Sequence, residues 1–436
     1  MAKGSATTER SVVIVSPHFP PATVAGVHRA RHLAKHLPVF GWRPIVVRAR
    51  EADYAESIDP ALGSLVPASV QQVRTPALPL GLTRSLGVGD IGIRTFPYLS
   101  ATLDRIIAQE RPSAIFITGF PFYPMLLAPR LKRRYGLPVV LDFQDPWVSA
   151  YGAERPALSK ARMAHRLAVF LEPKAVRAAS FITSVSETQN AQMAMRYPWL
   201  DATRMAAIPI GGDPDDFDAL RGAWLRDPQA RLAEGHINLS YVGAFLPRSG
   251  PLAQVLFAAL ADLRREQPAL AARLRLNFVG SSNQPDDRST FQVRPLAAQA
   301  GVDDLVREVP QRVPFLEALN LLATSQGLLL IGSDEPHYTA SKIYPALMSK
   351  TPFLSLFNDN SSAHRILSAA GGGVSLSFDD ADSLAALRGP LKDALLTLAT
   401  KPKSLGLSDP SAYAAYTAQA VAGQFAAIFD RLADHD

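Results

Sequence analysis

Two basic side chains occupy positions from which they could bind a phosphate. Arg248 lies in a glycine-containing loop, within residues 241–250 (YVGAFLPRSG), that follows an apolar run. Lys342 opens residues 341–352 (SKIYPALMSKTP), which predict a helix after the apolar run 328–331. A guanidinium, an ammonium and the backbone N–H groups of a helix N-terminus all suit diphosphate oxygens. We predict that Arg248 and Lys342 contact one diphosphate; an ordinary surface arginine is the alternative for Arg248.

A second candidate phosphate site lies near the start of the chain. Residues 16–32 (SPHFPPATVAGVHRARH) join a strand to a helix through a loop that contains Gly26, with His28 and Arg29 beside it. The N-terminus of such a helix is a natural phosphate site. The alternative is that Gly26 only serves the backbone path of the turn.

Three histidines share one face of that predicted helix. His28, His32 and His36 recur at every fourth residue, a spacing that could present imidazoles to a metal ion. No carboxylate of matching spacing accompanies them, and structural zinc sites usually need four ligands. We therefore expect no metal site and a solvated helix face, with His28, nearest the loop, as the functional candidate.

Polar residues also follow a buried strand in residues 141–147 (LDFQDPW). Open α/β sheets bind ligands at the carboxyl ends of their strands, so Gln144 and Asp145 are candidate catalytic residues. The alternative is that Asp145 caps the next turn and Trp147 fills the core.

Elements that could position these residues repeat twice along the chain. Apolar strand-like runs alternate with helical patterns, which predicts parallel sheets and the α/β class. The predicted strands are residues 11–16, 44–47, 114–118, 138–143, 181–185, 237–242, 275–279, 327–331 and 353–357. With 436 residues, the chain suits two doubly wound, Rossmann-like domains of about 200 residues each.

The turn-forming composition around residues 209–226 marks the boundary between the two domains. The predicted organisation is a loose tail (1–10), an N-terminal domain (11–208), a linker (209–235), a C-terminal domain (236–410) and a last segment (411–436) whose helix crosses back to the N-terminal domain.

Composition limits the classes of function. Hydrophobic residues make up 47% of the chain and charged residues 19%, as in a globular protein. The absence of cysteine excludes disulfides and thiolate chemistry, and we expect a cytoplasmic location. The net charge of +6 suits phosphate-bearing substrates or an anionic membrane surface. Nucleic acid is not an expected partner, because the aromatic residues lie inside apolar segments instead of alternating with basic ones.

One segment could contact the inner face of a membrane. Residues 160–177 mix basic side chains with Met163, Leu167, Val169, Phe170 and Leu171, as an interfacial helix does. A surface helix packed on the core is the alternative. No transmembrane helix is expected, because the apolar runs are far shorter than the roughly 20 residues that a span requires.

Taken together, residues 11–378 resemble the retaining GT-B glycosyltransferases of family 4, in particular a branch with an FPP…G loop and a DFRDPW-type motif. The matching segments are HFPPATVAGVHRARHLAKHLPVFGWRP, LDFQDPW, SFITSVSE, IPIGGDPDDF, LSYVGAF and SKIYPALMSKTP, in family order and at family spacing. The resemblance implies two Rossmann-like domains that face a central cleft. It implies a nucleotide-sugar donor, and a glycan, lipid-linked or small-molecule acceptor, with no cofactor and no metal.

The resemblance also implies roles for individual residues. Arg248 and Lys342 would offset charge on the leaving diphosphate, while Gln144 and Asp145 would position sugar or acceptor hydroxyls. The donor-binding residues that it implies are Gly26, His28, Arg29, Gly243, Arg248, Ser341, Lys342 and Tyr344. Proximity in sequence, and not the resemblance, makes Glu335 or Asp334 the candidate for a ribose contact.

The sequence departs from the family at several positions. Gln144 replaces an arginine or the active-site histidine, Pro345 and His337 replace two glutamates, and Ala244 replaces an arginine. These departures keep a second hypothesis open, a catalytically degenerate member that binds a glycan or a partner. A sugar-nucleotide epimerase is a third, for which the sequence offers no cluster of carboxylates and histidine.

Overall fold

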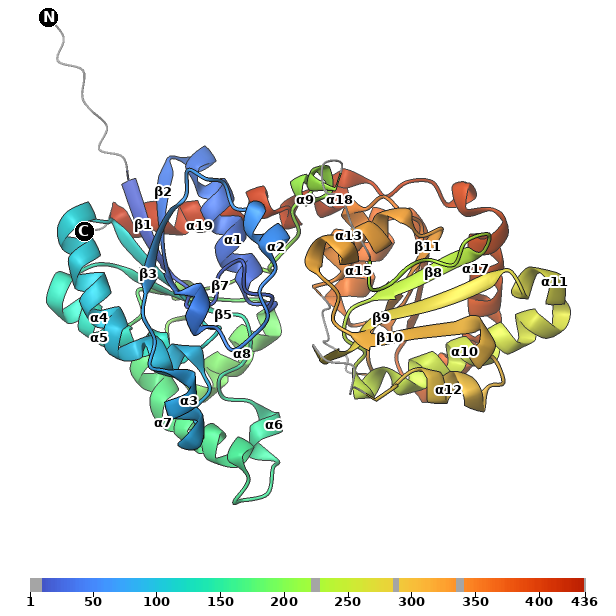
Figure 1. Ribbon diagram of the computed structural model, residues 1–436, viewed down its shortest axis with the longest axis horizontal. Helices are drawn as coiled ribbons and strands as arrows, with labels where there is room; N and C mark the ends of the chain where they lie inside the picture. Colours follow the sequence, from blue (N-terminus) through green and yellow to red (C-terminus); the bar gives the residue numbers. More distant parts are fainter. Residues whose placement is uncertain (1–9, 221–227, 285–289, 335–340, 435–436) are drawn as a thin grey trace, which may run out of the picture. The chain divides into compact units, whose positions relative to one another are not determined.

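The protein consists of two α/β units, each built on one parallel sheet (Figure 1). The computed structural model describes residues 10–220, 228–284, 290–334 and 341–434. The first unit comprises Met1–Ile210 and Ala418–Asp436, and the second comprises Gly211–Thr417. The chain therefore enters the second unit at Gly211, inside the predicted linker, and returns to the first at Ala418.

The first sheet has seven strands in the order β3-β2-β1-β4-β5-β6-β7. Its strands are β1 (Arg10–Val15), β2 (Trp42–Ala49), β3 (Gln71–Thr75), β4 (Ala114–Thr118), β5 (Val139–Phe143), β6 (Phe181–Ser184) and β7 (Met205–Ala207). The helices of this unit are α1 (Val27–His36), α2 (Pro60–Ser64), α3 (Leu80–Ser85), α4 (Ile91–Glu110), α5 (Ala128–Tyr135), α6 (Ala150–Ala153), α7 (Lys160–Ala178), α8 (Glu187–Arg196) and α19 (Ala418–Ala433).

The second sheet has six strands in the order β10-β9-β8-β11-β12-β13. Its strands are β8 (Ile237–Val242), β9 (Leu274–Gln284), β10 (Val306–Gln311), β11 (Gly327–Ile331), β12 (Phe353–Asn358) and β13 (Gly373–Phe378). The helices are α9 (Asp215–Ala219), α10 (Gly250–Glu266), α11 (Pro268–Ala271), α12 (Arg294–Gln299), α13 (Phe315–Thr324), α14 (Ile343–Met348), α15 (Ser362–Ala370), α16 (Ala381–Ala386), α17 (Arg388–Thr400) and α18 (Pro410–Tyr413).

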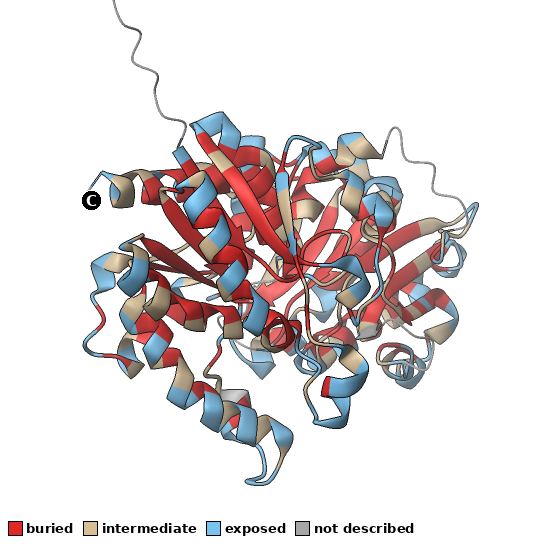
Figure 2. Ribbon diagram, turned by 60° about the vertical axis from the view of Figure 1, so that its left-hand side comes forward, coloured by how far each residue is buried: buried red, intermediate tan, exposed pale blue. Residues whose placement is uncertain are grey.

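Strand β1 shows why the first sheet is covered on both faces. Successive side chains of a strand point to opposite faces. Val13 and Val15 belong to one buried core, and Val12 and Ile14 belong to the core on the other face. All four are fully buried, and the central strands are coloured as buried in Figure 2. A continuous apolar run is what a parallel strand in this position requires.

The last helix of the chain completes the first unit. Phe425 and Phe429 of α19 are fully buried and pack edge-on against Phe116 of β4, at centroid distances of 5.3 and 6.3 Å. The predicted helix of the last segment begins later than expected: residues 410–413 form α18 in the second unit, and α19 starts at Ala418.

Within the described residues, none of the helices combines the length and apolar character needed to cross a bilayer.

Candidate functional site

Each sheet has one point at which the order of its strands reverses. In the first sheet it lies between β1 and β4, and in the second between β8 and β11. Ligands of open α/β sheets bind beyond the carboxyl ends of the strands at this switch point. The loops that follow these four strands are therefore the expected ligand sites of the two units.

Lys342 lies at the switch point of the second sheet. It is the residue before α14, and its side chain reaches the end of β8. Its Nζ contacts the hydroxyl of Tyr241, lies 3.4 Å from the carbonyl oxygen of Ala244, and sits 3.8 Å from the centroid of the Tyr241 ring. Both hydrogen-bonding partners are uncharged, and burial lowers the pKa of Lys342 to about 7. An anion at this position would supply a counter-charge for the ammonium.

Gly243 leaves the backbone beside Lys342 bare. Its φ is +127°, a value that residues with a Cβ atom rarely adopt. Its N–H donates to the carbonyl of Val279 at 2.8 Å. A Cβ atom built on it would lie 3.6 Å from Cδ of Lys342. The glycine is thus favoured by the backbone conformation of the loop, next to the side chain of Lys342.

Arg248 lies at the same edge but already has a carboxylate partner. Its Nε donates to Oδ1 of Asp334 at 2.5 Å, and the amide of Asp334 donates to the carbonyl of Arg248 at 3.2 Å. The Arg248 side chain is 56% exposed and that of Asp334 is 41% exposed. Such an exposed pair is weak, so an incoming diphosphate could compete for the guanidinium.

Several predicted donor-binding residues of the second unit have other surroundings. Ser341 is exposed next to Lys342, whereas Tyr344 is buried and packs against Tyr416 at a centroid distance of 5.2 Å. This places Tyr344 in the core and not at the open edge. Glu335 and His337 lie outside the described residues.

Arg29 of the first unit is part of a buried network. Its Nε donates to Oδ2 of Asp142 at 3.1 Å, and both side chains are fully buried. The guanidinium also contacts the carbonyl oxygens of Ile208 and Pro209, the latter at 2.9 Å. Thr183 donates to the other oxygen of Asp142 at 2.7 Å. In this network Arg29 joins α1 to the ends of β5 and β7 inside the domain; its prediction as a donor-binding residue stays a prediction.

Gly26 and Gln144 contact each other at the switch point of the first sheet. The side-chain amide of Gln144 donates to the carbonyl of Gly26 at 3.3 Å, and both residues are buried. A Cβ on Gly26 would lie 2.3 Å from the ring of Phe120, which follows β4. Packing therefore requires a glycine here, while the predicted catalytic Gln144 holds the loop.

Asp145 and Trp147 follow the same strand but differ in exposure. Trp147 is buried and stacks on Phe122, with centroids 5.3 Å apart and nearly parallel planes. The core-filling interpretation is thus the observed one for Trp147. Asp145 is exposed, although neighbouring protein atoms desolvate its carboxyl group enough to raise its pKa. Asp145 therefore stays the residue that we predict to contact a substrate hydroxyl.

The expectation of a solvated histidine face on α1 is wrong. His32 is 3% and His36 is 7% exposed, and His28 is half-buried. Nε2 of His32 lies 2.9 Å from the guanidinium of Arg31, and its Nδ1 lies 3.4 Å from the carbonyl of Ile210. The helix is covered on more than one side because α19 also packs against it.

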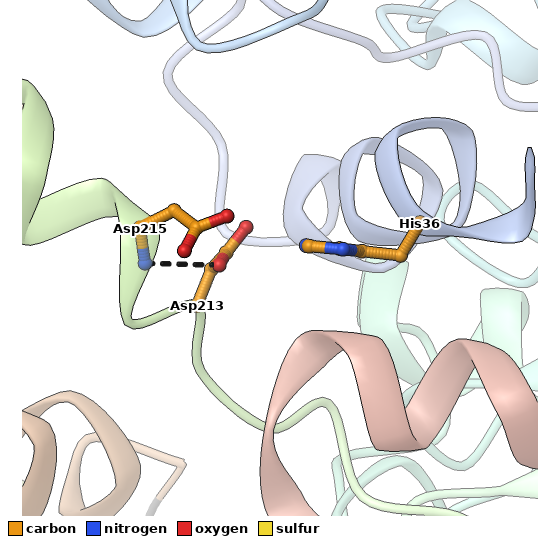
Figure 3. A group of neighbouring side chains, drawn as sticks. All are labelled: His36, Asp213 and Asp215. Atoms are coloured by element: carbon orange, nitrogen blue, oxygen red, sulfur yellow. Dashed lines mark hydrogen bonds between the residues drawn. The ribbon is translucent and has the colours of Figure 1, made fainter. Parts of the chain in front are cut away.

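Two aspartates at the start of the second unit contact each other. The amide of Asp215 donates to Oδ1 of Asp213 at 3.2 Å (Figure 3). His36, also drawn in Figure 3, belongs to the first unit, so we assign no ligand set to these three residues.

Sequence reasoning missed the partners of the two cations. Tyr241 and the carbonyl of Ala244 hold Lys342, and Asp334 holds Arg248. A buried tyrosine near the end of a strand was the available signal, because its hydroxyl normally finds a polar partner.

Comparison with known proteins places these observations in a family context. Residues 25–211 match the glycosyl transferase 4-like domain. The chain is 32% identical over 189 residues to the D-inositol 3-phosphate glycosyltransferase of Salinispora arenicola. That alignment covers 41% of this chain and 40% of the relative, so the chain spans less than half the length of this relative.

Solved structures are similar over nearly the whole chain. A glycosyltransferase of Rickettsia africae aligns with a TM-score of 0.58 at 14% identity, covering 98% of this chain and 100% of its own. HepE of Anabaena, solved in complex with UDP and glucose, aligns with a TM-score of 0.56 at 14% identity, covering 96% and 99%. Two parallel-sheet domains and these likenesses identify the fold as GT-B. The match to the glycosyl transferase 4-like domain lies almost wholly in the first unit.

Proposed function

We propose that this GT-B protein is a glycosyltransferase, which moves a sugar from a nucleotide-sugar donor to a hydroxyl of a glycan, lipid-linked or small-molecule acceptor. The observation that carries the proposal is the position of Lys342 beside the backbone of Gly243. Lys342 is a half-buried ammonium whose hydrogen-bonding partners among the described residues are uncharged. Lys342 and Gly243 lie at the switch point of the second sheet, where a diphosphate would complete the charge balance. The glycosyl transferase 4-like first unit supports the same activity.

In the proposed reaction, charge develops on the leaving diphosphate as its bond to the sugar breaks. Lys342 stabilises that charge, and Arg248 joins it by exchanging Asp334 for a phosphate oxygen. The leaving phosphate accepts the proton of the acceptor hydroxyl, and Asp145 orients hydroxyl groups. Transfer with retention of configuration, without metal or cofactor, is part of the proposal.

The names of the relatives suggest the first substrates to examine. HepE was solved with UDP, and the Salinispora relative is named for D-inositol 3-phosphate. We propose UDP- or GDP-sugars as donors, with inositol phosphates, sugars and lipid-linked glycans as acceptor candidates, and a cytoplasmic location.

The direct test incubates the protein with a panel of UDP- and GDP-sugars, with and without these acceptors. The measured quantity is the release of UDP or GDP. NMR of the product reports its anomeric configuration. We expect nucleotide release that requires Lys342. Folded protein that neither binds nor turns over any sugar nucleotide would overturn the proposal.

A second candidate is a degenerate member that binds without catalysis. Two predicted catalytic residues, Gln144 and Arg248, already have partners within the protein, which favours this candidate. Gln144 donates to the carbonyl of Gly26, and Arg248 pairs with Asp334. Calorimetry with UDP and GDP separates the candidates, since micromolar affinity of wild-type protein, lost in Lys342→Met, supports an intact donor site.

We also propose that α7 docks the protein on an anionic membrane surface. Met163, Leu167 and Phe170 are exposed and recur at helical spacing, so they form one apolar stripe. Basic residues accompany this stripe along the helix: Lys160, Arg162, Arg166, Lys174 and Arg177. The ammonium of Lys174 lies 3.5 Å from the centroid of the Phe170 ring. This combination fits acyl chains below anionic headgroups.

A further inference from the structure

A buried histidine and a glutamate form a pair at the switch point of the first sheet. His18 follows β1 and is 6% exposed, and its Nε2 lies 3.1 Å from Oε1 of Glu56. Nε2 must carry a proton to donate to the carboxylate, so a neutral ring leaves a lone pair on Nδ1. The pair thus presents an imidazole whose tautomer is set by its partner.

The imidazole ring is held in one orientation. It packs against the rings of Tyr54 and Phe120, with centroid distances of 5.8 and 5.5 Å. The hydroxyl of Tyr54 accepts from the amide of Phe19 at 3.3 Å, and Ser16 donates to the carbonyl of His18 at 2.6 Å. These contacts fix the loop that carries the histidine between the ends of β1 and β4.

The segment that carries Glu56 is joined to the same loop by backbone contacts. An isolated antiparallel bridge pairs Ala22 with Ile58. The amide of Asp59 donates to the carbonyl of Pro21 at 2.7 Å, and the hydroxyl of Thr23 donates to the carbonyl of Ser57 at 3.0 Å. The geometry of the pair is therefore set by the fold.

Each member of the pair keeps one polar atom unsatisfied. In the part of the chain that the structure describes, Nδ1 of His18 and Oε2 of Glu56 are buried and have no hydrogen-bond partner. Buried polar atoms are paired in the great majority of cases, so two neighbouring exceptions call for a ligand. Burial raises the pKa of Glu56, but the hydrogen bond and charge of His18 outweigh this and lower it overall, which keeps the carboxylate ionised. Oε2 is then an acceptor, and Nδ1 is an acceptor in the neutral ring and a donor in the protonated ring. Hydroxyl groups, which both donate and accept, can pair with both atoms.

A second acidic group, Asp90, interacts with the pair. Asp90 caps α4 by accepting from the amide of Ile93 at 2.9 Å; burial raises its pKa, and its carboxyl group interacts electrostatically with His18 and Glu56. Two carboxyl groups oppose the binding of a phosphate, whereas uncharged hydroxyls can donate to them.

We propose that the His18–Glu56 pair binds two hydroxyl groups of the acceptor, which is therefore polyhydroxylated and uncharged where it meets this pair. The inference rests on the proposed glycosyl transfer and assigns His18 and Glu56 as acceptor-positioning residues. A phosphate on the acceptor, if present, binds elsewhere.

Binding is tested by NMR of protein labelled with ¹⁵N-histidine, with glucose, myo-inositol and glycerol as polyol probes and inorganic phosphate as the anionic probe. We expect at least one polyol to shift a single imidazole signal that is missing in His18→Gln, while phosphate leaves it unmoved. His364→Gln is the matched control, since Nδ1 of His364 also lacks a partner but lies on α15. No shift with any polyol, or a shift with phosphate alone, overturns the inference.

Kinetics separates this inference from the proposed function. His18→Gln and Glu56→Gln are expected to raise the acceptor KM about tenfold or more, as for lost hydrogen bonds to charged groups, with UDP affinity within about twofold of wild type. His364→Gln should change neither. Intact transfer with an unchanged acceptor KM in both variants overturns the inference but leaves the proposed function standing. Absence of any transfer in wild type overturns the proposed function instead.

Discussion

The ammonium of Lys342 lies over the ring of Tyr241, with Nζ 3.8 Å from its centroid, and also contacts the phenolic hydroxyl. The cation is thus held by a ring face and neutral oxygens, which orient it without neutralising it. This explains why burial can lower the pKa of Lys342 to about 7.

Binding of UDP should therefore be linked to proton uptake. At pH 8 the free lysine is mostly neutral, and the diphosphate raises its pKa, so the complex gains close to one proton. Affinity should fall as the pH rises above about 7, by up to tenfold per unit while the complex stays protonated. Calorimetry in buffers of different ionisation enthalpy measures the uptake.

Lys342→Met is the matching variant for this linkage. It should abolish the proton uptake and slow sugar transfer by about 100-fold or more. Proton uptake that persists in this variant would show that another group titrates.

Asp334 should compete with the diphosphate for Arg248. Asp334→Asn removes the ion pair, so UDP is expected to bind up to about fivefold more tightly, with little change in stability, because exposed pairs contribute about 0.2–1 kcal/mol. The control is Asp304→Asn, which breaks a similarly exposed pair with Arg264. Calorimetry with UDP measures both; weaker binding in Asp334→Asn would mean that the carboxylate itself assists the ligand.

The strands that sequence patterns did not reveal share one property. They are β3, β7, β10 and β13, which form the edges of the two sheets. Central strands are buried on both faces and read as continuous apolar runs, whereas edge strands carry polar residues, as in residues 71–75 (QQVRT) and 306–311 (VREVPQ). All the predicted strands, which were the apolar ones, are present in the structure.

The sequence did not predict the burial of residues that contact distant segments. Position in the chain places Lys342 and Arg248 correctly at one sheet edge, because the end of a strand fixes where its loop begins. It cannot show that Arg29 meets Asp142, since that contact joins residues far apart in sequence. The burial of His32 likewise depends on contacts with Arg31 and Ile210 that helical spacing does not reveal.

The buried pair of Arg29 and Asp142 should be essential for the stability of the first unit. Asp142→Asn leaves a buried guanidinium without its counter-charge, which is expected to cost about 3–5 kcal/mol. Asp104→Asn is the control, because its ion pair with Arg130 is partly exposed, and about 1 kcal/mol or less is expected. Urea unfolding followed by tryptophan fluorescence measures the difference, and similar losses in both variants would contradict the assignment.

Gly26→Ala tests the close packing against Phe120. The added methyl group would lie 2.3 Å from the ring, so we expect a loss of about 1–3 kcal/mol by overpacking. Gly81→Ala should be nearly neutral, since a Cβ there meets open space. The double variant with Phe120→Leu should recover part of the loss, measured as a coupling energy in a double-mutant cycle of urea unfolding. If the losses of the two single variants simply add in the double variant, the loop that carries Gly26, and not the Phe120 ring, moves to accommodate the methyl group.

Docking of α7 is expected to depend on both charge and apolar contact. Leu167 and Phe170 are 43% and 62% exposed. Full burial of such a side chain contributes about 1.5–3 kcal/mol, so these two should each contribute about half of that. Each basic residue near an anionic surface adds about 1 kcal/mol. Wild-type protein should therefore sediment with vesicles that contain phosphatidylglycerol and far less with pure phosphatidylcholine. Leu167→Glu with Phe170→Glu should weaken this binding at least tenfold, because it removes apolar area and adds negative charge. Leu407→Glu, at an exposed leucine of the second unit, should bind like wild type. Equal sedimentation with both kinds of vesicle, or no loss in the double variant, would exclude α7 as the docking surface.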